Sequence, residues 1–187
     1  MLYVYTGPMY AGKTTKLLSI LYKYSLKNLK MVKITHESDV RDCVYTSEYT
    51  TSHNKNISDD IQNLELIKLK QLKSFDISNY DIIAIDEAQW FNDLYDTISS
   101  WVKLNKIIIC VGLDGDFNQN MFGDLYKLLP LSTKFKKLSS ICNRCSGNGS
   151  FTLLKNNEDC KKAENSKLVG GTDLYQSYCR KCLNDTF

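Results

Sequence analysis

Nine consecutive residues near the start of the chain have the types and spacing to bind the phosphates of a nucleotide. The stretch GPMYAGKTT matches the pattern G-x-x-x-x-G-K-[ST], in which closely spaced backbone N–H groups surround an anion. Its lysine can reach the β- and γ-phosphates, and the threonine after it can hold Mg²⁺. The motif leaves open whether the γ-phosphate passes to water, to a protein or to a small molecule. The predicted ATP and Mg²⁺ loop comprises Gly7, Pro8, Met9, Tyr10, Ala11, Gly12, Lys13, Thr14 and Thr15.

Two acidic residues follow an apolar run further along the chain. Asp86 and Glu87 come directly after YDIIAI, and the carboxyl ends of parallel strands face the ligand crevice. Asp86 is therefore predicted to act on Mg²⁺, and Glu87 either to orient a water or to accept a proton from an alcohol. An acidic first turn of a helix is the alternative interpretation. The letters DEAQ also resemble the DEAx box of helicases, although this chain has no room for a second motor domain.

Four of the seven cysteines have the spacing of a metal site. Two C-x-x-C pairs, separated by 33 residues, offer four thiolates in the tetrahedral arrangement that suits Zn²⁺. A site closed by four thiolates is predicted to be structural, with redox or buried thiols as the alternative. Of the other cysteines, Cys110 is expected in the core, whereas Cys43 and Cys160 stay unassigned. The predicted zinc ligands are Cys142, Cys145, Cys179 and Cys182.

Strands and helices alternate through most of the chain. Helical spacing of apolar residues predicts helices over Thr14–Lys27, Trp90–Leu104 and Phe122–Leu129, the last stopped by Pro130. The alternation predicts an α/β fold, a P-loop NTPase-type parallel sheet with flanking helices. We expect a nucleotide-binding domain over residues 1–139 and a small zinc-binding domain over 140–187, whose long loop covers a substrate. The predicted strands are Leu2–Thr6, Lys30–Thr35, Leu64–Leu69, Tyr80–Asp86, Lys106–Leu113 and Phe135–Leu138.

Composition argues against several classes of protein. A net charge of +3 with scattered basic residues does not favour a nucleic-acid partner. The chain contains no apolar run of the ~18 residues that a membrane span needs. A strand is predicted almost at the first residue, which leaves no room for a targeting peptide, so we expect a cytoplasmic location.

The motifs together resemble those of the type II thymidine kinases, which occur in cells, bacteria and large DNA viruses. The resemblance covers nearly the whole chain and keeps the family order. It implies that the acceptor is the 5′-hydroxyl of thymidine, with deoxyuridine as a second substrate, and that ATP, Mg²⁺ and a structural Zn²⁺ are bound by a homotetramer. The matching pieces are GPMYAGKTT, DVR, DEAQWF, GLDGDFNQNMFG followed by LLPL, CNRC, LVGGTDLYQSYC and RKC.

The resemblance also implies roles for individual residues. Glu87 would be the general base on the nucleoside hydroxyl, with Lys13 and Arg41 stabilising charge during transfer. Asp39, Asp86 and Gln89 would belong to the nucleotide and Mg²⁺ side. Here the family's D-T-R-Y reads Asp-Val-Arg-Asp, and Trp90 replaces the usual Phe. The implied substrate-binding residues are Met9, Trp90, Leu113, Phe117, Phe122, Thr152, Ser166, Lys167, Leu168, Val169, Gly170 and Tyr175, those from Ser166 to Gly170 lying on a lasso-like loop.

Two other functions remain compatible with the motifs alone. A zinc-ribbon P-loop ATPase acting on nucleic acid predicts hydrolysis stimulated by DNA or RNA, with steep salt dependence. A nucleotide-binding protein without catalysis predicts ATP binding and no turnover of any nucleoside.

Overall fold

A six-stranded parallel sheet forms the centre of the protein in its computed structural model, which describes residues 1–39, 61–155 and 174–185. The strand order is β3-β2-β4-β5-β1-β6, and every pairing in this sheet is parallel. The predicted α/β class is confirmed. The strands are β1 (Leu2–Thr6), β2 (Met31–His36), β3 (Leu64–Leu69), β4 (Ile82–Ile85), β5 (Ile107–Gly112) and β6 (Lys134–Lys137).

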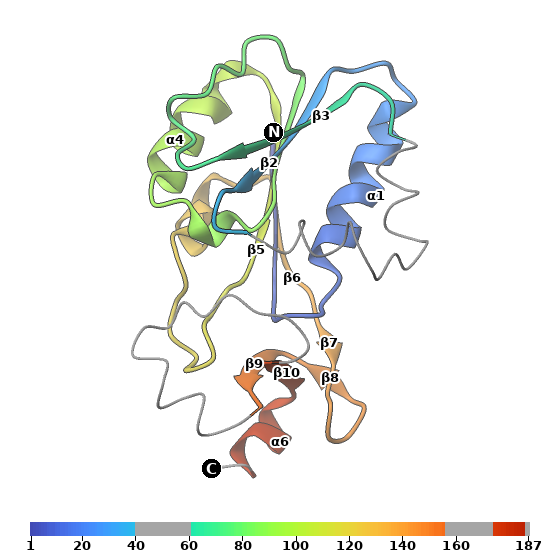
Figure 1. Cartoon of the computed structure of the whole chain (residues 1–187), viewed down its shortest axis with the longest axis vertical. Coiled ribbons are helices and arrows are strands. Elements are labelled where there is room, and N and C mark those ends of the chain that lie inside the picture. Colours follow the sequence, from blue (N-terminus) through green and yellow to red (C-terminus); the bar gives the residue numbers. More distant parts are fainter. Residues whose placement is uncertain (40–60, 156–173, 186–187) are drawn as a thin grey trace.

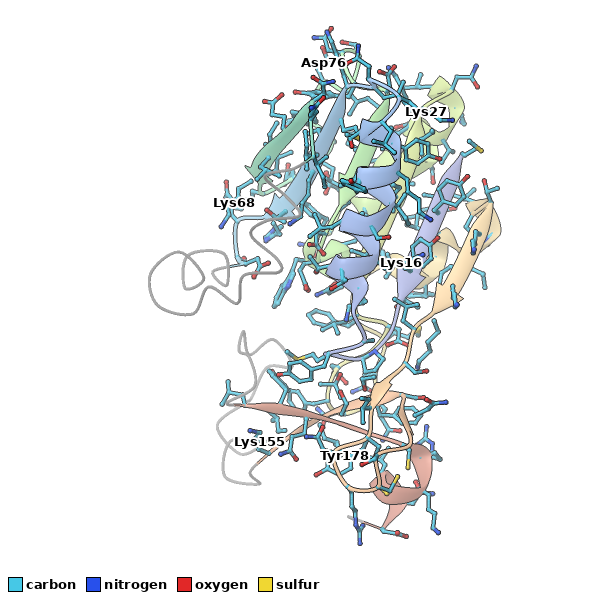
Figure 2. All side chains as sticks on the ribbon, turned by 90° about the vertical axis from the view of Figure 1, so that its right-hand side faces the viewer. Lys16, Lys27, Lys68, Asp76, Lys155 and Tyr178 are labelled. Carbon is cyan, nitrogen blue, oxygen red and sulfur yellow. The ribbon has the colours of Figure 1, made fainter. Side chains whose placement is uncertain are left out.

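Helices cover both faces of the sheet. Helix α1 (Lys13–Ser25) packs Leu17, Leu18 and Leu21 on one face, and α4 (Leu94–Trp101) lies on the other (Figure 1). Figure 2 looks onto α1 as it runs along the sheet, with Lys16 and Lys27 near its two ends. All four residues of β4 are buried, as expected for a strand covered on both faces.

A smaller module lies beyond one end of the sheet and comes from the C-terminal part of the chain (Figure 1). Its strands pair antiparallel, β7 with β8 and β9 with β10. The predicted boundary between residues 139 and 140 falls just before β7, and the division into two domains stays a prediction. The elements of this C-terminal module are β7 (Ser140–Ile141), β8 (Asn148–Gly149), β9 (Phe151–Leu154), β10 (Tyr175–Tyr178) and α6 (Arg180–Asn184).

Two predicted helices differ from the observed ones. The helix expected over Trp90–Leu104 begins only at Leu94, and short 3₁₀ turns flank it, η1 (Ala88–Trp90) and η2 (Val102–Leu104). The prediction that Pro130 stops a helix is wrong, since Pro130 lies inside the 3₁₀ helix η3 (Leu125–Leu131). The fixed backbone angle of proline is compatible with a 3₁₀ helix, and its missing N–H removes one bond from a short element.

Among the described residues, none of the helices is long and apolar enough to span a membrane. Several positions named from the sequence lie outside the described residues. They are Arg41, Cys43, Cys160, Ser166, Lys167, Leu168, Val169 and Gly170.

Adjacent residues on α4 give a test of this packing. Leu94 is fully buried, whereas Tyr95 is 38% exposed. Leu94→Ala should lower the free energy of unfolding by about 2–5 kcal/mol, because it removes buried methyl groups and leaves a cavity. Tyr95→Ala should change it by less than about 1 kcal/mol. Urea titrations of both variants check this, and equal losses would contradict the observed orientation of α4.

Candidate active site

The phosphate loop connects β1 to α1 at the carboxyl end of the strands, the end of the sheet that faces the C-terminal module (Figure 1). Gly7 and Gly12 have φ values of 144° and 70°, a region that favours glycine. A Cβ atom at Gly7 would collide with the carbonyl oxygen of Leu138. The first turn of α1 contains no acidic residue, so its positive end is available to an anion.

The side chains of Lys13 and Thr14 both make hydrogen bonds within the site. Lys13 is 8% exposed, and its Nζ donates to the Pro8 carbonyl oxygen over 2.7 Å. The Thr14 hydroxyl donates to Oδ1 of Asp86 over 3.2 Å. The predicted phosphate loop and the predicted acidic residue at the end of β4 are thus in direct contact.

The two oxygens of Asp86 have different partners. Oδ1 also accepts the Glu87 N–H over 3.1 Å, and Oδ2 lies 3.3 Å from Nζ of Lys33 on β2. Burial raises the pKa of the Asp86 carboxyl; the positive Lys33 opposes the rise and the negative Glu87 adds to it. Lys33 therefore favours the ionised carboxylate that a Mg²⁺ site requires.

Lys33 was missed in the sequence analysis, although a signal for it exists. It is a lysine within the strand MVKITH, paired in register with Ala84 of β4. Because side chains alternate along a strand, Lys33 shares a sheet face with Asp86, two residues beyond Ala84. Recognising this required the strand order, which the sequence pattern does not supply.

Glu87 is held in position by Gln89. The Gln89 Nε2 donates to Oε2 of Glu87 over 2.6 Å, and its Oε1 accepts the Leu113 N–H over 2.9 Å. Glu87 itself has a φ of 51°, an uncommon backbone conformation for a residue with a side chain. A Cβ atom at Gly112 or Gly123 would meet Gln89, so both glycines leave room for it. The site thus contains a buried carboxylate with a fixed orientation, one residue beyond Asp86.

A small apolar cluster lies between the phosphate loop and the C-terminal module. It includes four of the residues that, according to the family resemblance, bind the substrate. The cluster contains the buried Met9, Phe117 and Tyr175 and the partly buried Leu113, Leu154 and Leu174. The loop that carries Phe117 is fixed by Asp116, whose Oδ1 accepts the N–H groups of Asn118 and Asn120.

The other predicted site residues that the structure describes make contacts outside the side chains of this cluster. Trp90 and Phe122 contact each other edge to face, with ring centroids 5.1 Å apart. Thr152 on β9 is buried and accepts the Met9 N–H over 3.0 Å. Asp39 is buried beyond the end of β2, and its carbonyl oxygen accepts Nζ of Lys68.

The four predicted metal ligands come together at the base of the C-terminal module. The Sγ atoms of Cys142, Cys145, Cys179 and Cys182 lie within 4.8 Å of one another. In the second pair, the Cys182 N–H points at Cys179 Sγ over 3.4 Å. Burial acts to raise the pKa of Cys142, but backbone N–H donors outweigh it and lower that pKa to about 6. Four thiols at this spacing, with N–H groups aimed at sulfur, fit a tetrahedral metal site.

Comparison with known proteins places this geometry in context. A sequence model of the family described as thymidine kinase matches residues 1–183. The thymidine kinase of Amsacta moorei entomopoxvirus is 37% identical over 187 residues, covering 97% of this chain and 96% of the relative. That of Choristoneura biennis entomopoxvirus is 39% identical over 186 residues, with coverages of 97% and 95%. The thymidine kinase of vaccinia virus (strain Western Reserve) is 33% identical over 180 residues, with coverages of 96% and 94%.

The ion pair at Asp86 generates a stability prediction. Lys33→Met should lower the free energy of unfolding at neutral pH by about 2–4 kcal/mol, because it leaves a buried carboxylate without its counter-charge. Adding Asp86→Asn to that variant should recover part of the loss. The matched control is Lys137→Met, which breaks a more exposed pair with Asp114 and should cost less than about 1 kcal/mol. Urea unfolding of the four proteins would contradict the pairing if both lysine variants lost the same amount.

Proposed function

The chain belongs to the thymidine kinase family and is a nucleoside kinase, and from this premise we propose the reaction that it catalyses. It transfers the γ-phosphate of ATP to the 5′-hydroxyl of thymidine, giving dTMP and ADP, with deoxyuridine as a second acceptor. The observation that carries this proposal is the placement of Glu87, an oriented carboxylate next to Asp86, which itself bonds the phosphate loop through Thr14.

On the nucleotide side, the loop from Gly7 to Thr15 binds the triphosphate. Lys13 exchanges its bond to the Pro8 carbonyl oxygen for phosphate oxygens, which are stronger acceptors because they are charged. Thr14 and Asp86 would hold the Mg²⁺ that accompanies ATP, and that ion would supply positive charge to balance the negative charge of the phosphates. Asp39 and Arg41 complete this side, with Arg41 stabilising charge on the transferred group.

On the acceptor side, Glu87 takes the proton from the 5′-hydroxyl as that oxygen attacks the γ-phosphorus. Gln89 fixes the orientation of Glu87 through one amide group and is fixed in turn by the Leu113 N–H. Positioning of this kind is the main protein contribution to phosphoryl transfer, because the transfer itself needs little covalent chemistry from the protein.

The nucleoside binds where the apolar cluster meets the sheet edge. Flat apolar walls with a few polar groups suit a pyrimidine base. The loop from Ser166 to Gly170 lies outside the described residues, and from the resemblance alone we propose that its backbone groups meet the edge of the pyrimidine. The proposed walls are Met9, Trp90, Leu113, Phe117 and Phe122, and Thr152 and Tyr175 are further proposed substrate-binding residues.

Around this site we propose a nucleotide-binding domain over residues 1–139 and a zinc-binding domain over 140–187. The cysteine cluster holds a structural Zn²⁺, since four thiolates leave no open coordination position. We further propose that the enzyme assembles as a homotetramer in the cytoplasm.

The first test removes the proposed base. Glu87→Gln should keep the affinity for ATP and thymidine but lower kcat by about 10²–10⁴-fold, the range expected for loss of a general base. Glu65→Gln, an exposed carboxylate on the outer strand β3, is the control and should leave kcat unchanged. Steady-state turnover and nucleotide binding are measured on the same preparations. Near-normal turnover of Glu87→Gln would reject Glu87 as the base.

The acceptor itself is tested by following ATP turnover with each deoxynucleoside and with single-stranded DNA. Phosphorylation of thymidine, with the purine deoxynucleosides inert, is the expected result. Turnover that ignores nucleosides and rises with DNA would replace the kinase proposal by a nucleic-acid-dependent ATPase.

Metal analysis tests the zinc site. The wild-type protein should contain about one Zn²⁺ per chain, because the four thiols form one tetrahedral site. Cys145→Ser should lose most of this metal and lower the thermal stability, since zinc binding contributes to folding. Cys110→Ala, which removes a thiol from the core strand β5, should keep the metal. An unchanged zinc content in Cys145→Ser would exclude this cluster as the site.

A further inference from the structure

The C-terminal module holds the phosphate loop through the backbone N–H and carbonyl groups of one residue, Met9. The Met9 N–H donates to Oγ1 of Thr152 over 3.0 Å, and the Met9 carbonyl oxygen accepts from Oγ of Ser177 over 2.7 Å. Met9 is 8% exposed, Thr152 6% and Ser177 fully buried. These bonds join residues that are 143 and 168 positions apart in the sequence. Ser177 lies within the matching piece LVGGTDLYQSYC, but the sequence analysis assigns it no role.

The two hydroxyls stand side by side because of the strand register. Thr152 and Ser177 are direct partners in the antiparallel β9–β10 pair. The next pair on the same face, two residues along each strand, is Leu154 with Tyr175. Both of these side chains belong to the apolar cluster around Met9. One face of β9–β10 thus offers hydroxyls to the Met9 backbone and apolar groups to its side chain.

Met9 lies between two residues, Pro8 and Tyr10, whose conformations shape the rest of the phosphate loop. The residue before it, Pro8, supplies the carbonyl oxygen that Lys13 binds over 2.7 Å. The residue after it, Tyr10, has a φ of 63°, a conformation that persists in a residue with a side chain only when its surroundings enforce it. The Met9 N–H shares a peptide group with the Pro8 carbonyl, and the Met9 carbonyl shares one with the Tyr10 N–H. Fixing both groups of Met9 therefore fixes two consecutive peptide groups of the turn on which the loop N–H groups depend.

The backbone of Ser177 is held by Asn143, which lies between the two cysteines of the first C-x-x-C pair. Its backbone N–H donates to Oδ1 of Asn143, and its carbonyl oxygen accepts the Asn143 N–H over 2.9 Å. Asn143 follows the metal-ligand candidate Cys142 directly. In Figure 2 the module, marked by Tyr178, faces the end of α1 marked by Lys16, where the phosphate loop lies. Asn143, covalently next to Cys142, is therefore hydrogen-bonded to the Ser177 backbone, and the Ser177 hydroxyl is hydrogen-bonded to the phosphate loop.

We propose that Thr152 and Ser177 are positioning residues, which hold the phosphate loop in its ATP-binding conformation through the backbone N–H and carbonyl groups of Met9. The inference rests on the proposed function, since it concerns the affinity of the same loop for ATP. It goes beyond that function by making the C-terminal module part of the nucleotide site, and it requires no contact between either hydroxyl and ATP.

The test measures the affinity of a fluorescent ATP analogue, with Mg²⁺ and without nucleoside, for the full zinc-loaded chain. Ser177→Ala and Thr152→Val should each bind about 5- to 10-fold more weakly, the range expected for one lost hydrogen bond. Thr152→Ser keeps the hydroxyl and should bind within about 2-fold of wild type. Melting temperatures recorded in parallel separate loss of affinity from loss of fold.

A matched control comes from the same module. Ser140 is also buried, and its hydroxyl donates to the Gly149 carbonyl oxygen within the β7–β8 pair rather than to the phosphate loop. Ser140→Ala should lower the melting temperature, because a buried acceptor loses its donor, and leave ATP affinity unchanged. This result separates positioning of the loop from general stability of the module.

The outcomes discriminate between the two proposals. Wild-type affinity in both Ser177→Ala and Thr152→Val, or an equal loss in Ser140→Ala, would overturn the positioning role and leave the kinase proposal intact. If Ser177→Ala does not fold, the comparison of Thr152→Val with Thr152→Ser decides alone. A wild-type protein that fails to bind the ATP analogue would overturn the proposed function and this inference with it.

Discussion

The site is organised around one buried carboxylate. Asp86 is 4% exposed, and a buried charge without partners is strongly destabilising. Thr14 and the Glu87 N–H donate to one of its oxygens, and Lys33 faces the other. These groups come from α1, from the end of β4 and from β2, so the charge holds three elements together at one edge of the sheet. Because Thr14 belongs to the phosphate loop, giving Asp86 a different hydrogen-bond donor in its place would also displace that loop.

The local parts of this arrangement could be predicted from the sequence. The spacing of Gly7, Gly12 and Lys13 identifies a phosphate loop because backbone geometry within nine residues decides it. Asp86 was predicted because a buried strand that ends in an acidic residue places that residue at the carboxyl edge. The cysteine pairs were recognised for the same reason, since each C-x-x-C forms its half of the site locally.

What escaped prediction depends on which strands are neighbours and in what register. Lys33 could be recognised only once β2 was known to pair with β4, with Lys33 opposite Ala84. Ser177 could be recognised only once β10 was known to pair with β9, because that register sets its hydroxyl beside Thr152. The false helix start at Trp90 has a related cause. The helical spacing of apolar residues extends back to Trp90, the last residue of η1. The chain at η1 nevertheless forms a 3₁₀ turn, which lets the Gln89 side chain reach both Glu87 and the Leu113 N–H.

The phosphate loop is held from two directions by groups of the protein itself. On one side Lys13 bonds the Pro8 carbonyl oxygen, and on the other the β9–β10 pair holds the backbone N–H and carbonyl groups of Met9. In the proposed ATP complex Lys13 would exchange its bond for phosphate oxygens, whereas the two bonds to Met9 would stay in place. A loop that is ordered in advance loses less conformational entropy on binding, so more of the interaction with phosphate appears as affinity. The C-terminal module contributes to this order from outside the sheet. Its bonds to Met9 support the neighbouring Tyr10, whose φ of 63° is a conformation that persists only when the surrounding structure enforces it.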